Sequence, residues 1–422
     1  MITSFGIICG AAIAARWLAQ FWLEQINQRH VRAHAGTVPE AFRDVVDPPT
    51  YTKSVNYTLA GSRFHIWELV FDTLLLVIVL FSGVLPWFYE IYEKTFGSGA
   101  WAESGYLLVI AISMSLPGLP LAWYEQFHLE AQFGFNTTTP KIWWTDHLKG
   151  ILLGIALGWP LLALIIKCVE KLGNGWWVYA WACVVLFQLI MMIVAPILII
   201  PLFNKLTPLP EGELRNRLLA LAERAAFPAK DIQVMDGSKR SRHSNAFFTG
   251  IGRFRKIVLF DTLIEQLTPE ELEGVLAHEI GHYKKRHVLK MMLWSTVSLL
   301  VGFWILSILA QQEWFLGAFG FAPGHMAPAL LLFGMLSGLF TFWFSPIANQ
   351  WSRRYEYQAD AYASQTIRGS QPLIRALRKL NEKNLSNLTP HPIYSAFYYS
   401  HPALIEREQA LLQLDSKNQG NS

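Results

Sequence analysis

Seven long apolar stretches recur along the chain, and each approaches the length of about 20 residues that a helix needs to cross a bilayer. They cover approximately residues 3–23, 69–89, 105–124, 150–167, 176–200, 290–311 and 327–349. The first stretch lacks a basic leading region, so we predict a membrane helix there rather than a signal peptide. The pattern predicts a mainly α-helical, polytopic membrane protein with seven transmembrane helices.

These stretches divide the chain into four regions. We expect transmembrane helices 1–5 and their loops in residues 1–200, and transmembrane helices 6 and 7 in residues 290–350. The more polar residues 201–289 would form an insert outside the membrane, and residues 351–422 would form a C-terminal helix and tail.

The insert contains both helix and strand patterns. Residues 211–226 have the periodicity of an amphipathic helix. Strand patterns follow at 231–236, 244–250 and 256–260, which predicts a small β-sheet. Asn245, Ala246 and Phe247 are candidates for an exposed strand edge, to which an extended peptide could pair through its backbone. An ordinary buried strand is an equal alternative on the pattern alone.

Composition and charge support a membrane protein. Hydrophobic residues make up 52% of the chain and charged residues only 16%, against about 25% charged in soluble domains. Lys and Arg concentrate in 24–66, 125–149, 201–289 and after 350, while 312–326 has none. The positive-inside rule then places the N-terminus outside and the insert and C-terminus in the cytoplasm. The net charge of +4 is thus explained by topology and gives no indication of nucleic-acid binding.

Some membrane stretches contain acidic residues or proline. Glu68 and Asp72, four residues apart, would face an aqueous interior or lie at the membrane edge, and we assign them no role. Prolines predict kinks, which would suit helices around a cavity but also occur in ordinary bundles. The prolines are Pro117, Pro120, Pro160, Pro196 and Pro346.

The insert ends in a helical segment that contains an HExxH pattern, His278-Glu279-Ile280-Gly281-His282. Residues four apart share one helix face, so His278 and His282 can bind one metal ion. Glu279 lies about 100° around the helix, where it can reach a water molecule without binding the metal. Thr268 and Glu271 form a capping-box pattern at the start of this helix. The arrangement is typical of zinc proteases, in which a third ligand comes from elsewhere.

The third ligand does not come from the residues directly after the motif. His287 is nine residues after His278, which would put it on the opposite face of a continuous helix. The metzincin spacing fails because Lys285 and Val288 stand where that pattern needs glycine and histidine.

Two downstream motifs offer further site residues, each with an alternative. Glu356 and Asp360 share a helical face and could serve as third ligand and as partner of a ligand histidine, or Glu356 could form a surface ion pair with Arg353. His401 and Arg407 could stabilise an oxyanion, but Ser400 and the following proline also fit a helix start.

Taken in order, the motifs resemble the family of membrane zinc metalloproteases that includes the type-I CAAX prenyl protease. The matching motifs are FGFNTTT (133–139), PLFNKxTPL (201–209), HSNAFFTG (243–250), HExxH, SRRxEYxAD (352–360) and SHPxxxER (400–407). Related heat-shock membrane proteases are shorter with fewer spans, so the seven-span layout favours the CAAX-type branch.

The resemblance implies roles and an architecture. It implies one Zn²⁺ per chain held by His278, His282 and Glu356, with Glu279 activating water. It also implies substrate along Asn245 and Ala246, and His401 and Arg407 on the oxyanion side. Family members have seven helices around a large water-filled chamber, with zinc facing its interior.

The expected activity is peptide-bond hydrolysis by an integral-membrane zinc endopeptidase. Its partners would be the lipid bilayer and a peptide or protein substrate, prenylated or membrane-embedded, and membrane-protein quality control is a second candidate role. A non-proteolytic membrane chaperone or scaffold, and a zinc hydrolase acting on lipid, are the alternatives. The membrane would be the inner membrane in a bacterium or of the endoplasmic-reticulum type in a eukaryote; the sequence does not indicate oligomeric state, source or natural substrate.

Overall fold

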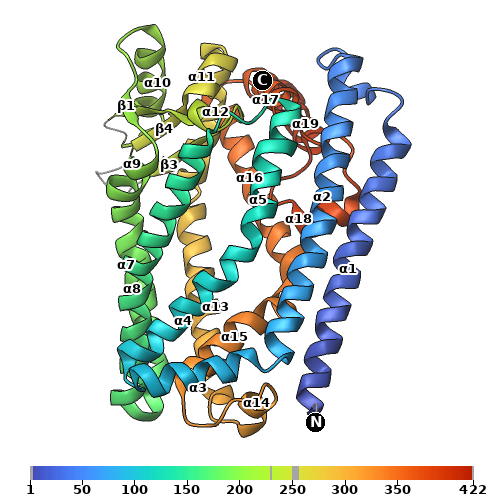
Figure 1. Cartoon of the computed structure of the whole chain (residues 1–422). Coiled ribbons are helices and arrows are strands. Elements are labelled where there is room, and N and C mark those ends of the chain that lie inside the picture. Colours follow the sequence, from blue (N-terminus) through green and yellow to red (C-terminus); the bar gives the residue numbers. More distant parts are fainter. Residues whose placement is uncertain (1–2, 229–230, 250–255, 421–422) are drawn as a thin grey trace.

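The computed structural model describes residues 3–228, 231–249 and 256–420. It is a tall bundle of long helices with the insert of residues 201–289 at one end (Figure 1). The helices of the bundle are α1 (Ser4–His34), α2 (Pro48–Phe81), α3 (Val84–Phe96), α4 (Ala100–Ser115), α5 (Leu119–Tyr124), α6 (Glu130–Phe133), α7 (Pro140–Leu172), α8 (Trp176–Val194), α9 (Ile200–Phe203), α13 (His287–Leu309), α14 (Glu313–Gly317), α15 (Met326–Thr341) and α16 (Ser345–Ile367).

Six helical segments of the described chain are long and apolar enough to cross a membrane. The longest, Pro140–Phe203, contains two of the predicted stretches, because a turn at Gly173–Gly175 separates α7 from α8. The large apolar side chains exposed on these segments, such as Leu148, Leu186 and Leu293, suit contact with lipid tails. The prediction of a polytopic helical membrane protein is confirmed, with seven as an approximate count.

The predicted stretch 69–89 is wrong in its bounds. The structure ends α2 at Phe81 and starts α3 at Val84. Gly83 between them has a φ of +78°, a left-handed conformation that glycine adopts without the Cβ clash of other residues. The helix instead begins further upstream, at Pro48, where Asp47 accepts a hydrogen bond from the backbone N–H of Thr50 at 2.6 Å.

Prolines mark the places where the long segments change helix type. Pro117 lies in a 3₁₀ turn before α5, and Pro346 is in the first turn of α16. Pro196 lies in a π-helical turn, Ala195–Ile199, that ends α8, because a proline removes one backbone donor from the ladder. Pro160, in contrast, lies inside α7, which continues through it.

The insert contains a four-stranded sheet packed with helices. Its strands follow the order β1-β2-β4-β3, and only β2 and β4 are parallel. Its elements are β1 (Leu206–Pro208), α10 (Glu213–Arg224), β2 (Ile232–Met235), β3 (Ala246–Thr249), β4 (Lys256–Phe260), α11 (Asp261–Gln266) and α12 (Pro269–Lys284). The predicted small sheet is confirmed, and β1 is an additional strand that the sequence pattern did not reveal.

Three C-terminal helices of the described chain follow α16, and the first and last of them lie beside the insert, at the end of the bundle away from the N-terminus (Figure 1). They are α17 (Gln371–Lys383), α18 (Pro392–Tyr398) and α19 (Leu404–Gly420). One hydrophobic core joins α17 and α19 to the sheet and to α12 through buried residues such as Leu259, Leu276 and Leu373, whereas α18 packs on α16 and α1. The first helix starts at one end of the bundle and the last helix ends at the other (Figure 1).

Candidate metal centre

The helix that carries the HExxH motif is fixed at its start. Thr268 accepts a hydrogen bond from the Glu271 backbone N–H, and the Glu271 carboxylate accepts one from the Thr268 backbone N–H at 2.9 Å. Glu271 is almost fully buried, and Lys379 of α17 pairs with it at 2.8 Å. The capping box predicted from the sequence is therefore present, and it anchors α12 to the C-terminal helices.

α12 and α16 cross in close contact, and Gly281 makes this approach possible. A Cβ at Gly281 would lie 2.9 Å from both Cα and O of Ala359, closer than van der Waals contact allows. The glycine between the two histidines thus lets the backbone of α16 approach. This crossing brings Glu356, one turn before Ala359, opposite the histidines.

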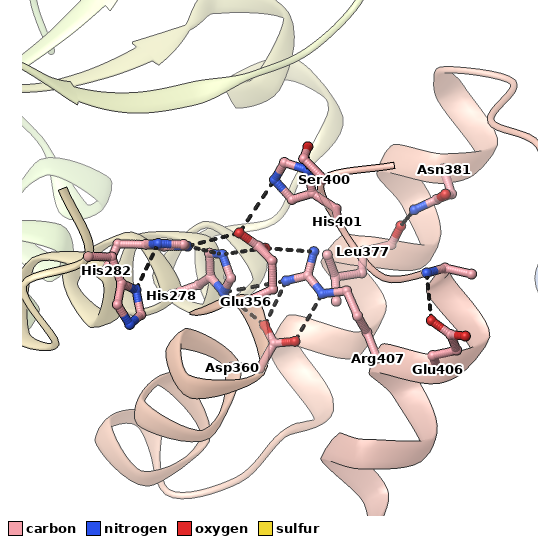
Figure 2. Close-up of polar contacts among 12 residues, drawn as sticks. His278, His282, Glu356, Asp360, Leu377, Asn381, Ser400, His401, Glu406 and Arg407 are labelled. Carbon is pink, nitrogen blue, oxygen red and sulfur yellow. Dashed lines mark hydrogen bonds and ion pairs between the residues drawn. The ribbon is translucent and has the colours of Figure 1, made fainter. Parts of the chain in front are cut away.

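Three ligand atoms converge at this crossing (Figure 2). Nε2 of His278 lies 3.4 Å from Glu356 Oε2, and Nε2 of His282 lies 3.3 Å from Glu356 Oε1. The two Nε2 atoms are 3.1 Å apart. Within the described chain, this is the group of three ligand side chains with atoms all within 4.8 Å of one another. Glu356 is only 4% exposed and faces the histidines, which excludes the alternative of a surface ion pair with Arg353.

The site has the chemistry that a divalent cation needs. Glu356 Oε2 is buried and accepts no hydrogen bond from the described residues, so a lone pair is left for a ligand. Burial opposes protonation of His278, yet the hydrogen bond with Asp360 and the nearby Glu356 carboxylate raise its pKa to about 9. Surroundings that favour an extra proton also favour a metal cation, so the residues fit the metal that the sequence predicts.

Asp360 and Arg407 form the layer behind the ligands. Asp360 Oδ1 lies 2.8 Å from His278 Nδ1, which leaves Nε2 of that ring for a metal. Arg407 donates to Asp360 through Nε at 2.9 Å and Nη2 at 2.6 Å. Its Nη1 lies 3.7 Å from Glu356 Oε2. Both side chains are buried, so their charges compensate each other with little screening by water.

His401 approaches the site from the open side. Its Nε2 is 3.5 Å from Glu356 Oε1, and its side chain is 64% exposed. Ser400 Oγ lies 2.9 Å from His401 Nδ1, where the hydroxyl can donate and leave the proton of a neutral ring on Nε2. In Figure 2, His401 and Arg407 converge on Glu356 from the loop before α19 and from α19 itself.

Glu279 has the environment expected of a base. Burial raises the pKa of its carboxyl, and the neighbouring His278 and His282 oppose this shift without cancelling it. A carboxylate with a raised pKa binds a proton more readily than an exposed glutamate does.

The prediction that His287 lies on the opposite helix face from His278 does not describe its position in the structure. α12 ends at Lys284, and Arg286 adopts a left-handed conformation with φ of +57° before α13 starts. The chain therefore turns, and His287 comes back to lie 3.1 Å from His282 through their Nδ1 atoms. The helical wheel gives the wrong position for His287 because it requires α12 to continue to residue 287, whereas α12 ends at Lys284. The left-handed conformation of Arg286, which turns the chain, has no clear signal in the sequence.

β3 lies at one edge of the sheet, since it pairs only with β4 among the described strands. Asn245 directly precedes it and is exposed, while Ala246 and Phe247 lie within it. β3 also contacts α12. This place at the edge of the sheet is the one expected of a strand to which an extended peptide could pair.

The FGFNTTT segment holds the insert against the membrane helices. The Arg242 backbone donates to Phe135 at 3.0 Å, and Thr138 donates to the carbonyl of Arg240 at 3.0 Å. The His243 ring stacks on Phe135, with centroids 4.0 Å apart, and Nε2 of His243 lies 3.2 Å from Glu130. These contacts fix the chain just before β3, a role that the sequence motif alone did not indicate.

A cavity of about 670 Å³ lies beside the metal-ligand cluster. Tyr57 and Glu130 of the membrane helices line it together with His243, Asn384 and His401. A peptide that reached the ligands could therefore occupy space between the membrane helices and the insert.

Comparisons with known proteins agree with this geometry. Residues 27–205 match the CAAX prenyl protease N-terminal domain, with five membrane helices, and residues 208–415 match peptidase family M48. CAAX prenyl protease 1 of Saccharomyces cerevisiae is 35% identical over 95% of this chain and 94% of its own length. The CAAX prenyl protease 1 homologue of Oryza sativa is 36% identical over 93% of this chain and 94% of its own length. The crystal structure of S. mikatae Ste24p superposes with a TM-score of 0.89 at 33% identity, covering 97% of this chain and 99% of that one. On these grounds the chain belongs to peptidase family M48, as an integral-membrane metallopeptidase related over almost its whole length to the CAAX prenyl proteases.

Proposed function

We propose that the chain is a zinc endopeptidase of the CAAX-prenyl-protease type, with His278, His282 and Glu356 as the zinc ligands. The convergence of these three side chains within 4.8 Å, with Glu279 next to the first, carries the proposal. Two imidazoles and one carboxylate are a donor set typical of catalytic zinc, which keeps one position open for water or substrate.

Zinc held by these residues would act as a Lewis acid that lowers the pKa of water towards about 7 and polarises a peptide carbonyl. Glu279 accepts the proton of the attacking water and returns it to the leaving amine. His401 donates its Nε2–H towards the oxygen on which negative charge develops. Arg407 adds positive charge on the same side, while its hydrogen bonds to Asp360 hold the partner of His278 in place.

The substrate would bind as an extended peptide along β3. Its backbone would pair with the free edge at Asn245, Ala246 and Phe247, in the manner of an added strand. The helices would enclose a water-filled chamber that admits the peptide, and the cavity beside His401 would be part of that chamber.

The names of the relatives favour a substrate with a prenylated C-terminus. Cleavage of membrane or stalled secretory proteins is the second candidate role, since the active site lies beside the membrane. The positive-inside rule favours a cytoplasmic insert, in the endoplasmic-reticulum membrane of a eukaryote or the inner membrane of a bacterium. No observation on the described residues favours the chaperone or the lipid-hydrolase alternative.

The test compares a farnesylated CAAX peptide with the same peptide lacking farnesyl, on the reconstituted full chain. Wild type and Glu279→Gln are assayed side by side, with products identified by mass spectrometry. We expect the wild type to cleave the farnesylated peptide with strong preference. Glu279→Gln should retain zinc and lose activity by about 10²–10⁴-fold.

Equal cleavage of both peptides would reject the prenyl preference and support a general membrane-protein protease. Cleavage of neither peptide would contradict the CAAX-type assignment. Proteolysis by clean Glu279→Gln protein at the wild-type rate would contradict the role of the base.

A further inference from the structure

His287 is a buried histidine that the mechanism above does not use. It has no exposed surface, and both of its ring nitrogens have polar partners. Its Nδ1 lies 3.1 Å from His282 Nδ1, and its Nε2 lies 3.0 Å from Gln358 Oε1. It thus stands between a proposed zinc ligand and the helix that carries Glu356.

The backbone before His287 is strained in a way that produces this contact. Arg286 has a φ of +57°, a left-handed conformation that costs a non-glycine residue roughly 1–2 kcal/mol. The turn ends α12 at Lys284 and starts α13 at His287. If α12 had continued, His287 would project away from His282. The strained residue is what returns the ring to the metal centre.

The adjacent part of α16 holds the ring in place. Tyr355 stacks on His287 with centroids 4.3 Å apart and planes at 17°. Gln358 is three residues further along, so it lies on the same helix face as Tyr355. One face of α16 thus presents Glu356 and Asp360 to the metal centre, and a neighbouring face fixes the orientation of His287.

The proton positions follow from the chemistry of each group. His282 needs the lone pair of Nε2 for a metal, since that atom faces Glu356 at 3.3 Å, so its proton is on Nδ1. Nδ1 of His282 therefore donates to Nδ1 of His287. The proton of neutral His287 is then on Nε2, which donates to the amide oxygen of Gln358. The ring N–H groups of both histidines then have acceptors, and this relay ends at the neutral amide of Gln358.

We propose that His287 is a positioning residue that fixes the tautomer and ring orientation of His282 and thereby strengthens zinc binding. The proposal rests on the zinc site of the proposed function. The two histidine ligands would then have different outer partners. The charged carboxylate of Asp360 accepts the hydrogen bond of His278, whereas the neutral pair of His287 and Gln358 accepts that of His282. Loss of such an outer partner typically costs 10- to 100-fold in metal affinity or activity.

The experiment measures zinc affinity of the purified full chain by competition with a chelator of known affinity. His287→Phe keeps a planar ring against Tyr355 but cannot accept the hydrogen bond. His287→Asn places an amide oxygen near the position of Nδ1 and can accept it. The matched control is His34→Phe, because His34 is an exposed histidine on α1. The absorption spectrum of the Co²⁺-substituted protein reports ligand geometry independently of turnover.

We expect His287→Phe to bind zinc 10- to 100-fold more weakly and to alter the Co²⁺ spectrum, and His287→Asn to recover most of the affinity. His34→Phe should match wild type. Wild-type affinity in His287→Phe would overturn the proposal. Equal losses in both His287 variants, with a lower unfolding temperature of the metal-free proteins, would also overturn it, because the residue would then act only in folding. Failure of the wild type itself to bind zinc would reject the proposed metal site instead.

Discussion

Replacing Gly281 by alanine tests whether the close crossing of α12 and α16 builds the metal site. Gly281 lies between the two histidines of the motif, inside α12. The added Cβ would lie 2.9 Å from Cα and O of Ala359 and 3.2 Å from Cβ of Tyr362. The first two are backbone atoms, so no side-chain rotation can relieve the contact.

Two effects of opposite sign decide the result. Alanine is about 1 kcal/mol more favourable than glycine inside a helix. Extra volume in a packed interface costs about 1–3 kcal/mol, and backbone contacts at this distance put the cost at the upper end. We therefore expect net destabilisation of about 1–2 kcal/mol. If α16 moves to relieve the contact, Glu356 moves with it, and each 1.4 kcal/mol lost from metal binding lowers affinity tenfold.

The assay measures the unfolding temperature with and without zinc, and zinc affinity by chelator competition. Gly154→Ala in α7 is the matched control, because a Cβ at Gly154 meets nothing within 4 Å. The control should retain wild-type affinity and stability or gain slightly. Gly281→Ala protein that is as stable as the control and binds zinc equally well would refute the reasoning.

Three further predictions concern the ligands and the base. Glu356→Ala should purify with much less than one zinc per chain by elemental analysis; a full equivalent would contradict its role as a ligand. Asp360→Asn should weaken zinc binding roughly 10- to 100-fold, because the amide supports His278 less well than a carboxylate, and an unchanged chelator titration would argue against this. In the zinc-free protein, the Glu279 carboxyl should titrate above 4.5, the ordinary value for glutamate, because burial raises its pKa; infrared difference spectra against Glu279→Gln measure this titration. A titration at or below that value would contradict the buried environment of Glu279.

The sequence by itself determined the features that depend on local periodicity. The apolar stretches predicted a helical membrane protein because a bilayer demands about 20 apolar residues whatever the tertiary fold. The HExxH spacing put His278 and His282 on one face because helix geometry fixes that relation, and the capping box at Thr268 located the helix start. Strand patterns within the insert likewise anticipated β2, β3 and β4.

The predicted boundary between residues 350 and 351 falls inside a helix, which the hydropathy pattern does not reveal. α16 runs from Ser345 to Ile367 without a break, so the last membrane segment and Glu356 share one helix. A division by hydropathy separates them because the helix changes from apolar to polar surroundings along its length. That continuity rigidly links the membrane helices to the metal centre.

Only the tertiary structure decided which distant residues meet. On sequence alone, Glu356 could be a surface ion-pair partner or a ligand. The crossing of α12 and α16 at Gly281 places its carboxylate against His278 and His282, as a ligand requires. His287 was excluded by a helical wheel, yet one left-handed residue, Arg286, brings it back against His282. Helix and strand patterns record interactions between near neighbours in the chain. The metal centre depends on helix packing and on a turn in a strained conformation. Contacts between residues far apart in sequence supply the free energy that stabilises both.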